Sequence, residues 1–466
     1  MGHKPIAIVL LAAGSGTRMK SKKPKVIHEI SGFSMLQHAL DTAAALNPEK
    51  LVTVVKHERD LIEAHVLDHN PDVLIADQGD VPGTGSAVEA GLDELGNFEG
   101  TVIVTYGDVP LLTKELLEEL VEFHEAENSS ATVLTSVIDD PTGYGRLIRE
   151  DNGSVSGIVE HKDATEDQLK VQEVNSGINV FDAEALREAL AEIGTDNSQG
   201  EKYLTDALAV IKEKGKHVAA FVGDDPWQTE GANDRAQLAT LALELNKRIL
   251  NEHMKAGVTI IDPNSTFIDK GVKIGQDVTI YPGTQILGNT VIGNDTKIGP
   301  DTTLRDMEIG EGVEIIRTHG SESKIGDGAS VGPFSYIRPK TLLKAKGKIG
   351  TYVETKGSTI GEGSKVPHLS YIGDAEIGKN TNIGAGAITA NYDGTNKNKT
   401  IVGDDVKTGS GSIFVAPVHI QDNAYTGAGA VIKKDVPEGS LAVSDFKQRN
   451  IEGWVESSNP ITKGKP

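Results

Sequence analysis

A glycine-rich turn near the start of the chain holds the first side chains with evident chemistry. It spans Leu11 to Met19 (LAAGSGTRM), includes Arg18, and is followed by Pro24-Lys25. Glycines let a backbone approach phosphate groups closely, and arginine and lysine neutralise phosphate charge. The spacing is neither GxGxxG nor the P-loop GxxxxGK[ST]. On spacing alone, a phosphate-binding loop and a tight structural turn both remain open.

Two later residues have side chains suited to catalysis. Asp108 follows an apolar run, and its carboxylate is a hard oxygen ligand of the kind that Mg²⁺ prefers, although aspartate is also a common turn former. His368 can exchange a proton near neutral pH, although an isolated histidine in a repeat is usually a surface residue. Their surroundings must decide between these alternatives.

An α/β sheet is expected to position the N-terminal residues. Residues 5 to about 230 alternate strand-like and helical stretches, which predicts a Rossmann-like domain with helices covering a sheet. The expected strands are Ile6–Leu11, Leu51–Val55, Thr101–Thr105 and Ala131–Val137, and the expected helices are Met35–Ala45, Gly85–Leu95 and Lys114–Ala126. Such folds bind nucleotides beyond the carboxyl ends of their strands, where the glycine-rich turn and Asp108 are expected.

A hexapeptide period organises the second half of the chain, from Gly257 to about Gly439. An aliphatic residue recurs at every sixth position: Ile268, Ile274, Ile280, Ile286, Ile292, Ile298 and Leu304. This period predicts a parallel β-helix, in which three short strands make one coil of about 18 residues, and about ten coils follow one another. The largest interruption, Thr389–Thr400, predicts a loop on the binding face.

The expected division is an α/β domain at 1–232, a linker helix at 233–256 and a repeat domain with a C-terminal tail at 257–466. Leu238, Leu241, Leu245 and Ile249 have helical spacing before Gly257. The net charge of −22 argues against a nucleic-acid partner, and the chain has no cysteine. The short apolar run at the N-terminus predicts a strand rather than a signal peptide, and no segment is long enough to span a membrane. A cytoplasmic protein is expected.

The pattern LAAGxGTRM followed by PK resembles the sugar nucleotidyltransferases, which join a sugar 1-phosphate to a nucleoside triphosphate. Further segments match in order: Gly83-Thr84-Gly85, Tyr106–Leu111, Gly143–Arg146, Ile158–Glu160, Asn175–Gly177 and Glu230–Asp234. With the hexapeptide half, nearly the whole chain is similar to bacterial bifunctional enzymes that fuse an N-acetylglucosamine-1-phosphate uridyltransferase to a glucosamine-1-phosphate N-acetyltransferase. The resemblance implies a left-handed β-helix, homotrimers, and acetyl-CoA and UTP as co-substrates.

The resemblance also implies roles for individual N-terminal residues. Arg18 and Lys25 are the expected catalytic cations, and Asp108 and Asn233 the expected Mg²⁺ ligands. The implied nucleotide and sugar contacts are Leu11, Ala12, Ala13, Gly14, Lys25, Gln78, Gly83, Thr84, Tyr106, Gly143, Glu160, Asn175 and Asn233. A sugar phosphate is itself an anionic nucleophile, so the reaction needs cations rather than a general base.

The C-terminal half carries the second set of implied residues. His368 lies in a segment similar to the family's HLxYxGDAEIG and is the expected base. The implied sugar-phosphate contacts are Arg338, Lys356, Tyr371, Asn382 and Lys397, and the implied acetyl-CoA contacts are Ala385, Asn391, Tyr392, Ser410 and Ala428.

Some positions depart from the family's pattern. Pro82, Ser86 and Phe33 are expected at the rim of the nucleotide pocket, with altered affinity rather than lost activity. Asp445 stands where the family has an arginine, so weaker CoA binding is expected, and Asp445→Arg should lower the KM for acetyl-CoA.

The leading hypothesis is an enzyme that makes UDP-N-acetylglucosamine for cell-wall polymers, with acetylation preceding uridylylation. One alternative is a single-activity sugar-1-phosphate nucleotidyltransferase whose β-helix is structural. A second alternative is a non-catalytic assembly protein with a vestigial pocket.

Overall fold

The computed structural model describes residues 4–195, 200–444 and 447–454. Contacts within the chain divide it into two units, Met1–Arg248 and Ile249–Pro466. Among the described residues, no helix is long and apolar enough to cross a membrane.

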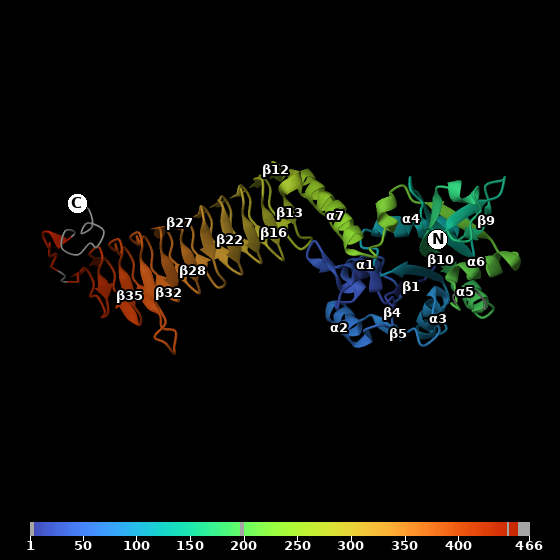
Figure 1. Cartoon of the computed structure of the whole chain (residues 1–466), viewed down its shortest axis with the longest axis horizontal. Helices are drawn as coiled ribbons and strands as arrows, with labels where there is room; N and C mark the ends of the chain where they lie inside the picture. The colour runs from blue at the N-terminus through green and yellow to red at the C-terminus, as the bar shows by residue number, and fades with distance from the viewer. Residues whose placement is uncertain (1–3, 196–199, 445–446, 455–466) are drawn as a thin grey trace, which may run out of the picture. The chain divides into compact units, whose positions relative to one another are not determined.

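The N-terminal unit is built on one nine-stranded sheet (Figure 1). Its main path has the order β11-β7-β10-β6-β1-β4-β5, and β8 and β9 extend from β10. The strands are β1 (Ile6–Leu11), β4 (Lys50–Val55), β5 (Leu74–Asp77), β6 (Thr101–Tyr106), β7 (Ala131–Val137), β8 (Arg146–Arg149), β9 (Val155–Val159), β10 (Glu173–Asp182) and β11 (Val218–Val222). Strands β6, β1, β4 and β5 are parallel, so their carboxyl ends meet at one edge.

Helices cover both faces of this sheet because successive side chains of a strand point to opposite faces. In β1, Ala7 and Val9 belong to one buried cluster and Ile8 and Leu10 to the other. The helices are α1 (Met35–Ala45), α2 (Arg59–His69), α3 (Thr84–Leu95), α4 (Lys114–Ala126), α5 (Ala183–Leu190) and α6 (Leu204–Glu213). The four expected strands and three expected helices are confirmed to within one residue at each end.

Helix α7 spans Arg235–Lys255. It ends where Gly257 adopts a positive φ of 102° and donates its N–H to the carbonyl oxygen of Met254. The division between the two units falls inside this helix, after Arg248. The expected domain boundaries at 232 and 256 stay predictions.

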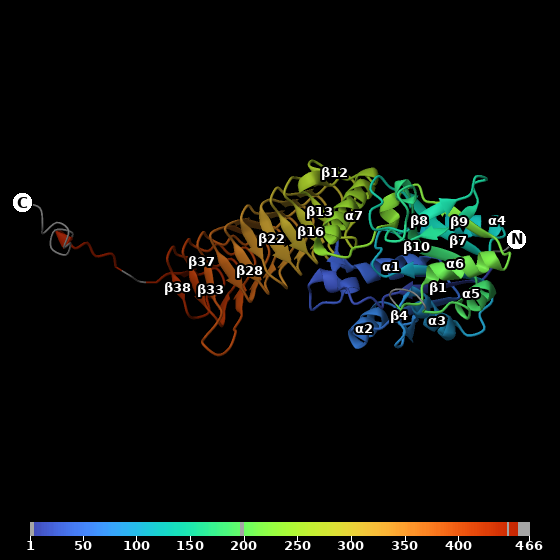
Figure 2. The same cartoon turned by 45° about the vertical axis from the view of Figure 1, so that its right-hand side comes forward.

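The C-terminal unit is a left-handed parallel β-helix, as expected (Figures 1 and 2). Its strands run from β12 (Thr259–Ile260) to β39 (Leu441–Ala442) and form three sheets with 7, 10 and 9 strands and one two-stranded sheet. The coil length follows from the register: Ile268 pairs with Ile286, and Ile286 pairs with Leu304.

Two inward positions in each repeat form the core of the prism. The aliphatic residues Ile286 and Ile298 are fully buried. Threonine two positions earlier, as at Thr284 and Thr296, also points inward and is fully buried, as the period of two along a strand requires. The Thr284 hydroxyl donates to the carbonyl oxygen of Tyr281 at 2.7 Å, so the buried hydroxyl is satisfied where the chain turns a corner.

Candidate functional site

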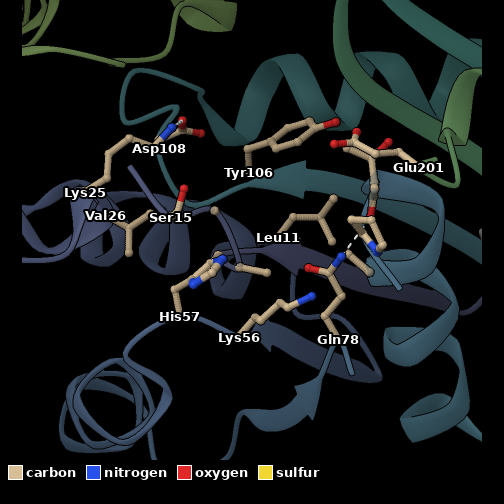
Figure 3. A pocket seen from close by; sticks show the side chains of 17 residues that line it. Leu11, Ser15, Lys25, Val26, Lys56, His57, Gln78, Tyr106, Asp108 and Glu201 are labelled. Atoms are coloured by element: carbon tan, nitrogen blue, oxygen red, sulfur yellow. Dashed lines mark hydrogen bonds and ion pairs between the residues drawn. The ribbon is translucent and has the colours of Figure 1, made fainter. Parts of the chain in front are cut away.

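A pocket of about 410 Å³ opens beyond the carboxyl ends of β1, β5 and β6 (Figure 3). Ten of the sequence-predicted residues line it: Leu11, Ala12, Ala13, Gly14, Lys25, Gln78, Gly83, Thr84, Tyr106 and Asp108. The glycine-rich turn and the end of β6 therefore lie together, as the parallel sheet requires. Only glycine fits at position 83. The φ of Gly83 is 117°, and a Cβ atom added there would lie 2.3 Å from the carbonyl oxygen of Lys202.

Four polar side chains converge at one end of this pocket. The Lys25 ammonium forms an ion pair with the Asp108 carboxylate and lies 3.4 Å from the amide oxygen of Asn233. Arg18 donates to the same Asn233 oxygen at 2.8 Å. Arg18 and Asn233 do not line the pocket themselves but join it through these contacts. The structure thus brings together all four residues expected to handle phosphates and metal.

The donor set also fits a divalent cation. Oxygen atoms of Asp108 and Asn233 both face the Lys25 ammonium, so two hard oxygen ligands surround one cationic position. Mg²⁺ commonly takes one or two protein oxygens and completes its shell with water and substrate phosphates. No group of three or more histidine or acidic side chains able to hold a metal occurs among the described residues. Asp108 and Asn233 would therefore hold a metal together with bound phosphates.

One of the expected sugar contacts, Asn175, bonds to Gly177, which packs against Tyr106. An added Cβ at Gly177 would lie 2.8 Å from the Tyr106 ring, and the amide oxygen of Asn175 accepts the Gly177 N–H at 2.9 Å. Burial is the largest cause that raises the Tyr106 pKa, and the charges of Asp108 and Glu160 add to it. The hydroxyl of the ring therefore stays protonated.

Glu160 and Gly143 do not line this pocket. Glu160 lines a neighbouring cavity of about 490 Å³, and burial raises the pKa of its carboxyl, with added repulsion from Asp163 and Asp206. Gly143 has a positive φ of 88° in the turn before β8. Their sugar-binding roles stay predictions.

The departures from the family occupy three different environments. Pro82 lines the pocket. Ser86 is buried and bonded to Gln78 behind the pocket wall. Phe33 is not among the pocket-lining residues; its ring packs edge-on against His38 at 5.8 Å. The expectation that Phe33 lies at the rim is wrong, because the β2–β3 hairpin (Glu29–Ile30 and Phe33–Ser34) turns it toward α1.

The acetyltransferase residues gather at two corners of the β-helix. His368 ends β30 (Lys365–His368) and precedes the first corner, where Leu369 has a φ of 49°. Strand β31 (Tyr371–Gly373) then runs to the second corner at Asp374, whose φ is 50°. Asn382 pairs with Lys365 on the face of β30, so it lies on the same side of the prism as His368.

His368 begins a column of exposed or half-buried residues along the first corner. Each member's backbone carbonyl oxygen accepts an N–H from the next coil. The His368 carbonyl accepts the Gly386 N–H at 3.1 Å. The Ala385 carbonyl accepts the Gly411 N–H and the Ser410 carbonyl accepts the Gly429 N–H, both at 2.7 Å. Ala428 directly precedes Gly429. Three expected CoA residues therefore continue the line that His368 starts.

The second corner carries the cations. Arg338 pairs with Glu354 at 2.8 Å in β28 (Glu354–Lys356). The ammonium groups of Lys356 and Lys397 are close neighbours, and a hydrogen bond from Lys356 is the largest cause that lowers the pKa of Lys397. Tyr371 is close enough to both Arg338 and Lys397 to interact with them electrostatically.

The interrupted repeat forms a loop that projects from the prism after β33 (Ile388–Ala390) (Figure 1). At its base, the Asn391 amide donates to Asp374 at 2.5 Å. Tyr392 pairs with Lys397 across the loop and is 62% exposed. The predicted loop is confirmed, and its base contacts the second corner. Asp445 lies outside the described residues, so the expectation of weak CoA binding stays a prediction.

The sequence motifs did not predict every residue that lines the nucleotide pocket. Lys56, His57 and Glu201 line the nucleotide pocket, but they follow β4 or precede α6 without a sequence pattern of their own. Their positions depend on tertiary folding, although Lys56 could have been found because it follows an expected strand that lies beside β1.

Fold and site together define a nucleotidyltransferase joined to a hexapeptide-repeat acyltransferase. Residues 8–171 match the family model described as the MobA-like NTP transferase domain. Residues 271–306 and 399–434 match the bacterial transferase hexapeptide model of six repeats.

Similar proteins cover almost the whole chain. The chain is 58% identical to "Bifunctional protein GlmU" of Paenarthrobacter aurescens strain TC1, over 98% of this chain and 93% of the relative. The proteins of the same name from Pseudarthrobacter chlorophenolicus and Corynebacterium glutamicum strain ATCC 13032 are 57% and 53% identical over 98% of this chain and 93% and 95% of theirs. The chain belongs to the GlmU family. It is a bifunctional enzyme of UDP-N-acetylglucosamine synthesis with a uridyltransferase and an acetyltransferase domain, which replaces both alternative hypotheses.

Proposed function

We propose that the pocket beside the glycine-rich turn transfers uridylyl groups with the help of Mg²⁺. The observation that carries the proposal is the convergence of Lys25, Asp108 and Asn233, with Arg18 bonded to Asn233. A phosphate oxygen of N-acetylglucosamine 1-phosphate attacks the α-phosphorus of UTP, and the bond to pyrophosphate breaks. Two anions must meet in this reaction, so the cationic side chains lower the charge repulsion between them.

Different side chains of the pocket have different roles in this reaction. Lys25 and Arg18 neutralise the phosphates, and the Tyr106 side of the pocket holds the sugar. Asp108 and Asn233 would hold Mg²⁺, which supplies charge neutralisation between phosphate oxygens when it is bound.

At the β-helix, His368 acts as the general base in acetyl transfer. The amine of glucosamine 1-phosphate attacks the thioester carbon of acetyl-CoA, and His368 accepts the amine proton. The carbon–sulfur bond then breaks, and the proton passes to the departing sulfur to give the CoA thiol. Arg338, Lys356 and Lys397 supply positive charge for the sugar phosphate, and the column from Ala385 to Ala428 lies along the path of CoA.

A second copy of the chain would complete this site. His368 and the lysine pair lie at different corners, on either side of β31, and the exposed Tyr392 loop projects outward. We therefore propose a homotrimer whose neighbouring prisms combine the two groups. The same proposal places the enzyme in the cytoplasm, where UTP and acetyl-CoA are produced.

A coupled assay tests both proposals. The enzyme receives glucosamine 1-phosphate, acetyl-CoA, UTP and Mg²⁺, and the intermediates are followed by chromatography. N-acetylglucosamine 1-phosphate should appear before the UDP-sugar, and EDTA should make it accumulate. UDP-glucosamine formed before acetylation would contradict the order. Light scattering on the intact chain should give a mass of three copies.

A further inference from the structure

Ser86 is a buried serine that contacts Gln78, one of the expected nucleotide contacts. The side-chain amide nitrogen of Gln78 lies 3.1 Å from the Ser86 hydroxyl, 3.0 Å from the Gly83 carbonyl oxygen and 3.2 Å from the Val81 carbonyl oxygen. The Ser86 hydroxyl itself lies 2.8 Å from each of those two carbonyl oxygens. Ser86 is 5% exposed, so a ligand in the pocket does not need to touch it.

These partners determine which end of the Gln78 amide faces the pocket. Carbonyl oxygens only accept hydrogen bonds, so the amide NH₂ must face them and the amide oxygen must face away. The Ser86 hydrogen goes to one of the carbonyl oxygens, which leaves the hydroxyl oxygen as a third acceptor for the Gln78 NH₂. In Figure 3, a dashed line leaves the side-chain nitrogen of Gln78, and the side-chain oxygen lies on the other side of the amide.

The turn that carries these acceptors is held in place by the backbone of Lys202. Its N–H donates to the Pro82 carbonyl oxygen at 2.9 Å, and its carbonyl oxygen accepts the Gly85 N–H at 2.7 Å. The Gly83 carbonyl oxygen also accepts the N–H of Ala87 in the first turn of α3. The turn before α3 is thus fixed on both sides, and Ser86 ties Gln78 to it.

We propose that Ser86 is a positioning residue for nucleotide selection, which presents Gln78 to the pocket as a hydrogen-bond acceptor. This inference rests on the proposed uridylyl transfer and deepens it. Uracil carries an N–H at N3, which can donate to the Gln78 oxygen. Cytosine carries a lone pair at N3, which the same oxygen repels. Loss of the Ser86 hydroxyl removes one of the three acceptors that hold the Gln78 NH₂ in this orientation, so the amide is held less firmly and discrimination against CTP weakens.

Threonine and valine provide a matched pair of variants, because they have nearly the same shape and differ by the hydroxyl. In the intact chain, kcat and KM are measured for UTP, CTP and 3-methyl-UTP, which lacks the N3 hydrogen. Ser86→Thr should keep the preference for UTP. Ser86→Val should lower the UTP-to-CTP ratio of kcat/KM by about fivefold to tenfold, the effect of roughly one hydrogen bond, with most of the change in KM. The penalty for 3-methyl-UTP should shrink in parallel.

The two proposals can fail separately. Equal ratios for Ser86→Thr and Ser86→Val, in enzymes that both turn over UTP, would overturn the positioning role alone. A wild-type chain without uridylyl transfer would overturn the proposed function of the pocket. If both variants unfold, their thermal transitions reveal it. Ser86→Ala, compared with the wild type, then tests the loss of the hydroxyl without the added methyl groups.

Discussion

Lys25 and Asp108 form an ion pair although they are 83 positions apart in the chain. Their side chains are only 14% and 17% exposed, so each charge depends on the other for much of its solvation. Removing one partner of such a pair leaves the other charge poorly compensated. The pair therefore keeps a compact charged site in place before any phosphate enters.

Asp108→Asn should reduce uridylyl transfer by at least about 100-fold, because removing one electrostatic contact to the transition state commonly costs this much. Acetyl transfer should be unchanged, since it occurs in the other unit. Pyrophosphate release and Mg²⁺ titration measure the first effect, and thiol release from CoA measures the second. The exposed Asp72 offers a control, Asp72→Asn, that should retain both activities. Near-normal uridylyl transfer by Asp108→Asn would contradict the metal-binding role.

His368→Asn should reduce acetyl transfer by about 10²- to 10⁴-fold, the usual contribution of a general base. The substitution keeps a polar side chain but removes the group that accepts the proton. Uridylyl transfer should continue at the wild-type rate. His319 lies on an earlier coil beside Tyr336, so His319→Asn is the matched control and should keep both activities.

Local patterns explain what could be predicted from sequence. The inward positions of the β-helix repeat every six residues, so Ile286 and Ile298 could be placed without tertiary information. Strand β1 is a continuous apolar run, typical of a parallel strand buried on both faces. Strand β10, with the sequence EVNSGINVFD, has no such pattern. Its place between β6 and β7 depends on long-range antiparallel pairing.

The same distinction applies to the sites. The glycine-rich turn and Asp108 follow apolar strands, so their meeting could be expected from a parallel sheet. Ser86 was expected at the rim but is buried beneath Gln78, because the first turn of α3 directs it inward. The ion pair of Arg338 with Glu354 joins neighbouring coils, and the six-residue period does not specify which outward side chains of those coils meet.

Lys397 provides a pH-dependent prediction for acetyl transfer. Its pKa is lowered, first by the hydrogen bond with Lys356, so it loses its proton at a lower pH than an ordinary lysine. The KM for glucosamine 1-phosphate should therefore rise with pH before ordinary lysines deprotonate. Lys397→Met should raise KM about tenfold near neutral pH, through loss of a charge-assisted contact to phosphate, and should flatten the profile.

Lys399 is the control for this effect, because it lies two positions further along the same loop and pairs with Glu376 at 2.6 Å. Lys399→Met should leave both KM and its pH profile unchanged. Initial rates between pH 7 and pH 10 provide the measurement. If the KM of Lys397→Met for glucosamine 1-phosphate still rises with pH as in the wild type, another group causes the titration.

His124 makes the N-terminal unit sensitive to acid. It is buried in α4, its Nδ1 lies 2.9 Å from the Thr132 hydroxyl, and burial is the largest cause that lowers its pKa to about 4. The unfolded state, with a histidine pKa near 6.5, binds a proton more readily than the folded state. The stabilising contribution is therefore complete above about pH 6.5 and is lost as pH falls toward 4, by up to about 3 kcal/mol.

Denaturation by guanidinium, followed by Trp227 fluorescence in a Trp454→Phe background, measures this loss between pH 7 and pH 4. His124→Asn cannot titrate, and its side chain can still bond Thr132, so its unfolding free energy should fall less steeply with acid. Phe123→Leu changes the neighbouring helical residue, which packs against Phe221. It should lower stability at every pH and keep the wild-type slope. Equal slopes for His124→Asn and the wild type would mean that other groups cause the acid sensitivity.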